Sequence, residues 1–252
     1  GSMPLTGPFT ITNIATVTGD IFASDMSPGG DIYAIDQATA GLFTIAKDTG
    51  VTTPVATLTG APAGVTFTGI SWNPVDSTFY VLATDGTTTT FFSLDSGTGA
   101  LTTIGVTGNA LGIWIAIDNA GIIYMADVGD DSLYTIDATT GVGTIVGALG
   151  VDINFAQEAD IDPTTNTLYM ASYTAAGASE ILSVDVTTGT ATSLGAVTNA
   201  PELGVFAIDG GIDNNFICDD AIAIGLGVIP SNGPSNTAGG ASNVCETGAT
   251  NA

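Results

Sequence analysis

Hydrophobic and polar residues alternate in short runs along this chain, and alternation is the period of a β-strand. The runs SLYTID at 132–137 and ILSVDV at 181–186 show it clearly, because successive side chains of a strand point to opposite faces. No stretch holds a helical period over three turns. Turns rich in glycine and threonine separate the runs, so the sequence predicts an all-β fold built from many short strands.

Two markers recur in phase, about every 45 residues, and repetition at that period is typical of propeller blades. The first is an aromatic residue in segments such as GDIYAID and STFYVLA, at Tyr33, Tyr80, Tyr124, Tyr169 and Phe216. The second is a Thr-Gly turn, which supplies the positive φ of a tight hairpin, with its glycine at Gly7, Gly50, Gly99, Gly141 and Gly189. We therefore predict a β-propeller of about five four-stranded blades. The alternative is a β-sandwich, whose strands would not repeat in sets of four.

The phase of the markers also predicts how the propeller closes. The segment ITNIATVTG at 11–19 matches VATLTG and TIGVTG, so it reads as a fourth strand without its first three. The C-terminal region offers GVFAID at 204–209 as a first strand, then NNFICDD and AIAIGLG. We expect the N-terminal strand to pair with the C-terminal blade, because closure removes an exposed sheet edge.

These boundaries give a simple domain organisation. Residues 1–3 (Gly-Ser-Met) have the composition of a cloning remnant, residues 4–229 form the propeller, and residues 230–252 are a tail rich in Gly, Ser and Asn. No apolar run approaches the roughly 18 residues of a membrane-spanning helix, so we expect no membrane insertion. An isolated domain of this kind is expected to be a monomer.

The formal net charge is −24, with one basic residue and no histidine. Nucleic-acid binding needs Lys or Arg against phosphate, so this composition excludes it. Strong acidity favours divalent cations and cationic partners, or serves solubility alone. The two cysteines, Cys218 and Cys245, suggest one disulfide that tethers the tail, and hence an oxidising, extracellular or cell-surface location.

Candidate chemistry gathers where the first strand of each blade begins, at the mouth of the central channel. The residues there are Asp25, Trp114, Gln157, Glu158 and Asp160. Clustered carboxylates suit calcium, and Trp114 is a candidate ligand platform. The alternative is that the channel carboxylates are simply hydrated. A second acidic group, Asp127, Asp130 and Asp131, is a candidate surface metal site, although it lacks the Gly and Glu of an EF-hand and also reads as a solvated turn.

Other acidic residues recur with the repeat. Asp95, Asp137 and Asp185 each precede the glycine of a Thr-Gly turn by four residues. Recurrence predicts a structural role, since a carboxylate at this position can accept backbone N–H bonds across the turn. The recurring tyrosines are expected to pack between blades.

The segments DIYAIDQATAGLFTI, IIYMADVGDDSLYTIDATTG and ADIDPTTNTLYMAS resemble the repeats of bacterial exported propellers of the YVTN and quinoprotein-like superfamilies. The resemblance implies a secreted or cell-surface protein that serves in binding, adhesion or scaffolding. Pyrroloquinoline quinone is not implied, because the tryptophan docking motifs are absent. The C-terminal region resembles the start of a Cys-containing module of secreted marine-bacterial proteins, through Asn215, Cys218, Ala221, Ile222 and Cys245.

Three functions are compatible with these features. The first is a non-enzymatic binding or scaffold module with an extracellular carbohydrate or protein ligand. The second is a carboxylate-based glycoside hydrolase that uses Glu158 with Asp160 or Asp25. The third is a purely structural spacer. The repeats carry no asymmetric catalytic set, which favours the first.

Overall fold

A computed structural model of the protein describes residues 2–154, 157–173, 179–198 and 203–209. The chain divides into two compact units, Gly1–Ser27 with Asp31–Gly210, and Pro28–Gly30 with Gly211–Ala252. All elements in the described part of the chain are β-strands, and they lie in the first unit.

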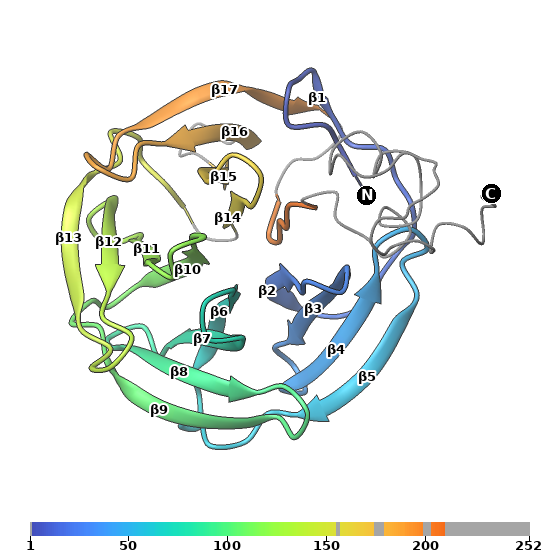
Figure 1. Cartoon of the computed structure of the whole chain (residues 1–252), viewed down its shortest axis with the longest axis vertical. Helices are drawn as coiled ribbons and strands as arrows, with labels where there is room; N and C mark the ends of the chain where they lie inside the picture. Colours follow the sequence, from blue (N-terminus) through green and yellow to red (C-terminus); the bar gives the residue numbers. More distant parts are fainter. Residues whose placement is uncertain (1, 155–156, 174–178, 199–202, 210–252) are drawn as a thin grey trace, which may run out of the picture. The chain divides into compact units, whose positions relative to one another are not determined.

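Four antiparallel four-stranded meanders follow one another along the first unit (Figure 1). The first comprises β2 (Ile21–Met26), β3 (Asp31–Asp36), β4 (Gly41–Ala46) and β5 (Thr52–Thr57). The second comprises β6 (Thr66–Asn73), β7 (Thr78–Thr84), β8 (Thr89–Asp95) and β9 (Ala100–Val106). The third comprises β10 (Gly112–Ile117), β11 (Ile123–Asp127), β12 (Ser132–Ile136) and β13 (Gly143–Ala148). The fourth comprises β14 (Glu158–Asp162), β15 (Thr167–Tyr173), β16 (Ser179–Val184) and β17 (Ala191–Thr198), with β1 (Phe9–Thr10) added at its outer edge.

The first strand of each sheet is the innermost, and these strands contact each other in the order β2, β6, β10 and β14, with β14 also contacting β2. Figure 1 shows the same arrangement, with β5, β9, β13 and β17 outermost. This is a β-propeller-like arrangement of four blades. The all-β prediction is confirmed, and the four described blades fall where the repeat places them.

The two sequence markers occupy equivalent places in the described blades. The tyrosine lies in the second strand each time, and the Tyr33 ring meets the Phe79 ring of the next sheet at a centroid distance of 4.7 Å. Apolar clusters fill the space between successive described sheets, so Tyr33, Tyr80 and Tyr124 lie between blades as predicted. Tyr169 belongs to a cluster with Leu203 and Phe206. The glycines of the Thr-Gly turns have positive φ, at 68° for Gly50 and 77° for Gly99 and Gly141.

Neighbouring sheets are also joined by backbone hydrogen bonds at their outer strands. Leu101 N donates to Thr59 O over 2.8 Å, which links the second sheet to the segment just after β5 of the first. Gly143 N donates to Thr107 O and Ala191 N to Leu149 O in the same way, over 2.8 and 2.9 Å. Each joint connects the end of one outer strand to the beginning of the next, so the blades are coupled through their main chains.

The N-terminal strand differs from the prediction. It is β1, only Phe9–Thr10, and it pairs in parallel with Val197 and Thr198 of β17. Residues 13–19 form no strand, and Thr12 makes a single bridge to Ser2. A strand needs a partner for its ladder of hydrogen bonds, and the partner we expected for residues 11–19 lies outside the described residues. Ser2, assigned above to a cloning remnant, contributes backbone bonds to Thr12.

Several predictions fall beyond the described residues. The second and third strands of the fifth blade, Phe216, the Cys218–Cys245 disulfide and the 230–252 tail all lie there. The expected first strand of that blade, 204–209, is described but contains no strand.

Candidate carboxyl cluster at the inner strands

Three of the predicted site residues come together on the innermost strands. Asp25 belongs to β2, and Glu158 and Asp160 belong to β14. The charge of Asp25 raises the pKa of both β14 carboxyl groups, so the three groups lie close together in the interior. Their exposed fractions are only 6%, 0% and 8%. The sequence therefore identified the cluster, but it lies buried and not at an open channel mouth.

Each carboxyl group accepts a hydrogen bond from the main chain of a neighbouring segment. Asp25 Oδ2 accepts from Trp72 N over 2.7 Å, in the second sheet. Asp160 Oδ2 accepts from Ile208 N over 2.6 Å. Glu158 Oε2 accepts from Ser24 N over 3.0 Å, which links the fourth sheet to the first. These bonds make the carboxyl groups connectors between segments.

Burial raises the pKa of all three groups, because removal from water disfavours the charged form. Desolvation raises the pKa of Asp25 to about 6, against the lowering effect of hydrogen bonds from Trp72, Met26 and Ser71. Desolvation and the charge of Asp25 raise the pKa of Asp160 well above its usual value. Desolvation dominates at Glu158 too, with repulsion from Asp25 and Asp160 added.

Trp114 does not join the cluster. It occupies the same register position in β10 as Glu158 in β14, opposite the residue two beyond the sheet's tyrosine. Its side chain is fully buried in the apolar cluster between the third and fourth sheets. Full burial leaves the indole no exposed face on which a ligand could stack, so the structure does not support the platform prediction.

Four buried polar atoms have no hydrogen-bond partner in the described part of the molecule. They are Trp114 Nε1, Gln157 Oε1, Glu158 Oε1 and Ser172 Oγ. The other end of the Gln157 amide donates to Asn154 O. Buried polar atoms are normally paired, with protein or with water. Two of the four, Gln157 Oε1 and Glu158 Oε1, lie at the start of β14.

The Asp127, Asp130 and Asp131 group serves local structure. Asp127 accepts from Gly129 N and Leu111 N, over 2.6 and 2.9 Å. Asp130 accepts from the Tyr134 hydroxyl over 2.5 Å, and Asp131 accepts from Ile153 N over 3.0 Å. Each carboxylate thus accepts from a different strand or loop, and Asp127 is buried, so the group is more than the solvated turn that the sequence suggested.

Neither acidic group has the arrangement of a metal site. Within residues that the structure describes, no set of three or more His, Cys, Asp or Glu side chains is placed to hold a metal ion. In the inner cluster, both oxygens of Asp25 and of Asp160 already accept backbone hydrogen bonds. The calcium expectation therefore gains no support from the geometry.

The recurring turn aspartates behave as the sequence predicts. Asp95, Asp137 and Asp185 each accept from the backbone N–H two residues on, over 3.0, 2.8 and 2.8 Å. Their pKa values are lowered chiefly by side-chain hydrogen bonds from Thr98, Thr139 and Thr187. These carboxylates stabilise the turns in their ionised form.

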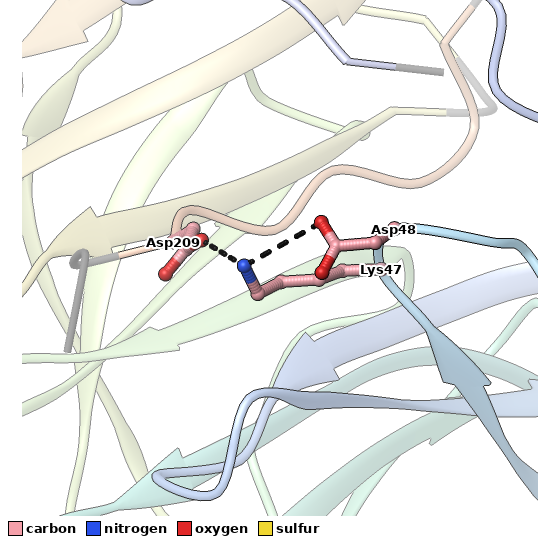
Figure 2. A network of polar contacts seen from close by, with 3 residues as sticks. All are labelled: Lys47, Asp48 and Asp209. Carbon is pink, nitrogen blue, oxygen red and sulfur yellow. Dashed lines mark ion pairs between the residues drawn. The ribbon is translucent and has the colours of Figure 1, made fainter. Parts of the chain in front are cut away.

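The single basic side chain lies near the segment 203–209. Lys47 Nζ is 2.9 Å from Asp209 Oδ2 and 3.7 Å from Asp48 Oδ1 (Figure 2). Lys47 lies in the turn between β4 and β5, so this pair connects 203–209 to the first sheet, while Ile208 connects the same segment to the fourth. No sequence pattern predicts the pairing of Lys47 with Asp209.

The geometry defines a β-propeller-class protein whose inner polar residues connect blades. Residues 4–207 match the family described as "Domain of unknown function (DUF4394)", and the chain belongs to that family. No curated protein matches the chain. None of the described residues forms a helix long and apolar enough to cross a membrane.

Solved structures share the fold at low sequence identity. A structural genomics protein of unknown function from Bacteroides thetaiotaomicron has a TM-score of 0.51 at 15% identity, over 69% of this chain and 42% of that one. The PQQ-bound aldose sugar dehydrogenase of Streptomyces coelicolor has a TM-score of 0.51 at 16% identity, over 69% and 63%. A putative gluconolactonase has a TM-score of 0.50 at 12% identity, over 71% and 63%. The chain thus matches less than two thirds of the length of each, and the likeness shows the propeller fold alone.

Sequence reasoning missed the partners of the cluster because they are backbone amides. Ser24 N, Trp72 N and Ile208 N carry no side-chain signature that a sequence pattern could reveal. One signal was available. Asp25 and Asp160 occupy the same place in the repeat. Each accepts a hydrogen bond from a residue about one repeat further along the chain, Trp72 for Asp25 and Ile208 for Asp160, and these two residues also occupy equivalent places in the repeat.

Proposed function

We propose that the chain is a non-enzymatic binding or scaffold module of an exported or cell-surface protein, with an extracellular carbohydrate or protein as its ligand. One observation carries this proposal. The carboxyl groups that would form a catalytic pair are buried and accept hydrogen bonds from the backbone of neighbouring strands. Their chemistry is used to join blades.

A glycoside hydrolase is the second candidate, because a general acid needs a raised pKa and Glu158 has one. The same burial that raises this pKa also keeps a glycosidic oxygen away from the carboxyl group. Proton transfer requires hydrogen-bond reach to the substrate, and Glu158 is fully buried. We therefore place catalysis second.

An immobilised glycan array combined with a reducing-sugar assay tests the assignment. We expect retention of particular glycans without release of reducing ends, and the same retention by Glu158→Gln. Glu180→Gln, the same chemical change on β16, is the matched control. Turnover that disappears in Glu158→Gln and persists in Glu180→Gln would establish the hydrolase instead. Neither retention nor turnover, on glycan and protein arrays alike, would leave the spacer function.

We further propose that the propeller has five blades, closed by the N-terminal segment and completed by residues up to 229. The contacts of 203–209 support this. Ile208 N donates to Asp160 as Trp72 N donates to Asp25, so Ile208 lies beside the fourth sheet as Trp72 lies beside the first. The parallel pairing of β1 with β17 likewise repeats the joints between the other outer strands.

The contact between Ala15 and the turn at Gly50 of the first sheet also supports closure by the N-terminal segment. A β-carbon added to Gly50 would overlap Ala15, as one added to Gly99 would lie 2.9 Å from Ala56 of the preceding outer strand. Residue 15 therefore occupies the position of an outer strand that precedes the first sheet. Deletion of residues 4–19 should lower the melting temperature and cause aggregation, because it exposes an edge. A deletion protein that stays monomeric and melts unchanged would refute closure.

Export rests on the acidity and the two cysteines. Titration of free thiols in unfolded, unreduced protein should find none if Cys218 and Cys245 are joined. Two free thiols would remove both the disulfide and the argument for an oxidising compartment.

A further inference from the structure

The inner carboxyl cluster lies where three segments of the first unit meet. β2 and β14 are linked by the bond from Ser24 N to Glu158 Oε2. Segment 203–209 is linked to β14 by the bond from Ile208 N to Asp160 Oδ2. Asp25 and Asp160 face each other across this junction. Three carboxyl groups, all at least nine-tenths buried, thus hold two sheets and one segment together.

Protonation decides whether this arrangement is favourable. Asp25 and Asp160 are close enough for the charge of Asp25 to raise the pKa of Asp160, so a proton on one of the two buried carboxyl groups relieves their repulsion. Glu158 Oε1 has no described hydrogen-bond partner, so the ionised group would carry an uncompensated charge in the interior. Like charges in one buried site cannot all ionise without strong repulsion.

We propose that Asp25, Glu158 and Asp160 form a proton-dependent junction, which holds β2, β14 and segment 203–209 together while protonated and loosens when the protons leave. This junction goes beyond the proposed binding function, because it regulates the stability of the fold and involves no ligand. As pH rises, the three carboxyl groups of the junction release to solvent the protons that they hold in the folded state.

Several polar side chains surround the three carboxyl groups of the junction. Tyr33 pairs with Asp25 in the β2–β3 register, and Tyr169 pairs with Asp160 in the β14–β15 register. The Ser71 side chain, on β6, lowers the pKa of Asp25. At the end of segment 203–209, Asp209 is paired with Lys47 of the first sheet.

The direction of the pH dependence follows from linkage. A carboxyl group whose pKa is higher in the folded state contributes stability that is complete below the unfolded pKa, near 4, and is lost as pH rises through the folded pKa. For Asp25 that window runs from about 4 to about 6. For Glu158 and Asp160 it extends further upward, because their pKa values are raised more strongly.

Melting temperatures of the full chain between pH 4 and pH 9 test the proposal, with Glu158→Gln as the variant. Glutamine keeps an oxygen that accepts from Ser24 N and places an uncharged NH₂ where Oε1 has no partner. We expect the melting temperature of the native sequence to fall as pH rises, and the fall to be smaller in Glu158→Gln. Above pH 7 the variant should melt higher than the native sequence. Glu180→Gln should follow the native curve.

Two results would overturn the proposal. One is an identical pH dependence in the native sequence and Glu158→Gln. The other is a calcium-induced rise in melting temperature that Glu158→Gln abolishes, since the cluster would then hold a cation and not protons.

Infrared spectroscopy of the native chain provides a readout that needs no variant. A protonated-carboxyl band should persist at pH 6, where exposed carboxylates are ionised. Its absence there would also refute the junction.

Discussion

Gly69 marks a place where two inner strands approach closely, and it offers a sharp test of how blades pack. A β-carbon added there would lie 2.8 Å from Ile115 N and 3.2 Å from both Ile115 Cγ1 and the Trp114 carbonyl carbon. The first of these distances is too short for a real β-carbon, and the atom it meets is backbone. Since φ at Gly69 is not positive, the substitution Gly69→Ala tests packing and not backbone conformation.

The magnitude follows from the cost of overpacking. Inserting a methyl group into a packed interior costs about 1–3 kcal/mol when backbone must shift. For a domain of this size, 1 kcal/mol corresponds to about 2–4 °C in melting temperature. We therefore expect Gly69→Ala to melt about 2–12 °C below the native sequence.

Gly97→Ala is the matched control in the same sheet. Its added β-carbon would meet only Asp95 Oδ1, at 3.4 Å, and its φ is not positive. Restricting the unfolded chain should make it neutral or stabilising by up to about 1 kcal/mol. Differential scanning calorimetry of both variants decides the matter. Equal melting temperatures would show that β6 and β10 are not packed as described.

Three further predictions concern single side chains. Asp185→Asn should reduce the loss of stability below about pH 4, because a lowered folded pKa gives stability that disappears as pH falls through it; melting curves from pH 2 to pH 5 measure it. Tyr80→Phe should lower the free energy of unfolding by about 1 kcal/mol, since the hydroxyl donates to Asp76 over 2.7 Å, and denaturant titration checks this. Burial and Asp76 raise the pKa of Tyr80 to about 12 in the native sequence, so the ultraviolet titration of the variant should lack one tyrosine that ionises late. Trypsin has a single site in the chain, after Lys47, and Asp209→Asn should speed cleavage there by removing the 2.9 Å ion pair, whereas an unchanged rate would show that the pair does not restrain this turn.

The sequence predicted the features that repeat. Tyr33 and its equivalents lie in second strands, and Gly50 and its equivalents occupy positive-φ turns, because local chemistry decides both. Asp25 and Asp160 were also placed together, since they share one position in the repeat. A feature that recurs in several copies can be read from one sequence.

The features missed depend on contacts between segments that lie far apart in the sequence. Glu158 accepts from Ser24 of β2, 134 residues away in the sequence, and Asp160 accepts from Ile208, 48 residues away. Trp114 looked like a platform because its residue type suits one, yet neighbouring sheets fill that position with core. The parallel pairing of β1 was missed because strand direction in the N-terminal segment depends on its neighbour and not on its own pattern.

The parallel joint between β1 and β17 has a mechanical consequence. Tension that enters before Phe9 and leaves after Thr198 pulls the two strands in opposite directions along their axes. The hydrogen bonds between them are then loaded in shear, all at once, whereas an antiparallel edge pulled from adjacent ends opens one bond at a time. Forced unfolding is governed by the unfolding rate and not by equilibrium stability. A module tethered in this way at a cell surface would resist stretching more than the two-residue length of β1 suggests.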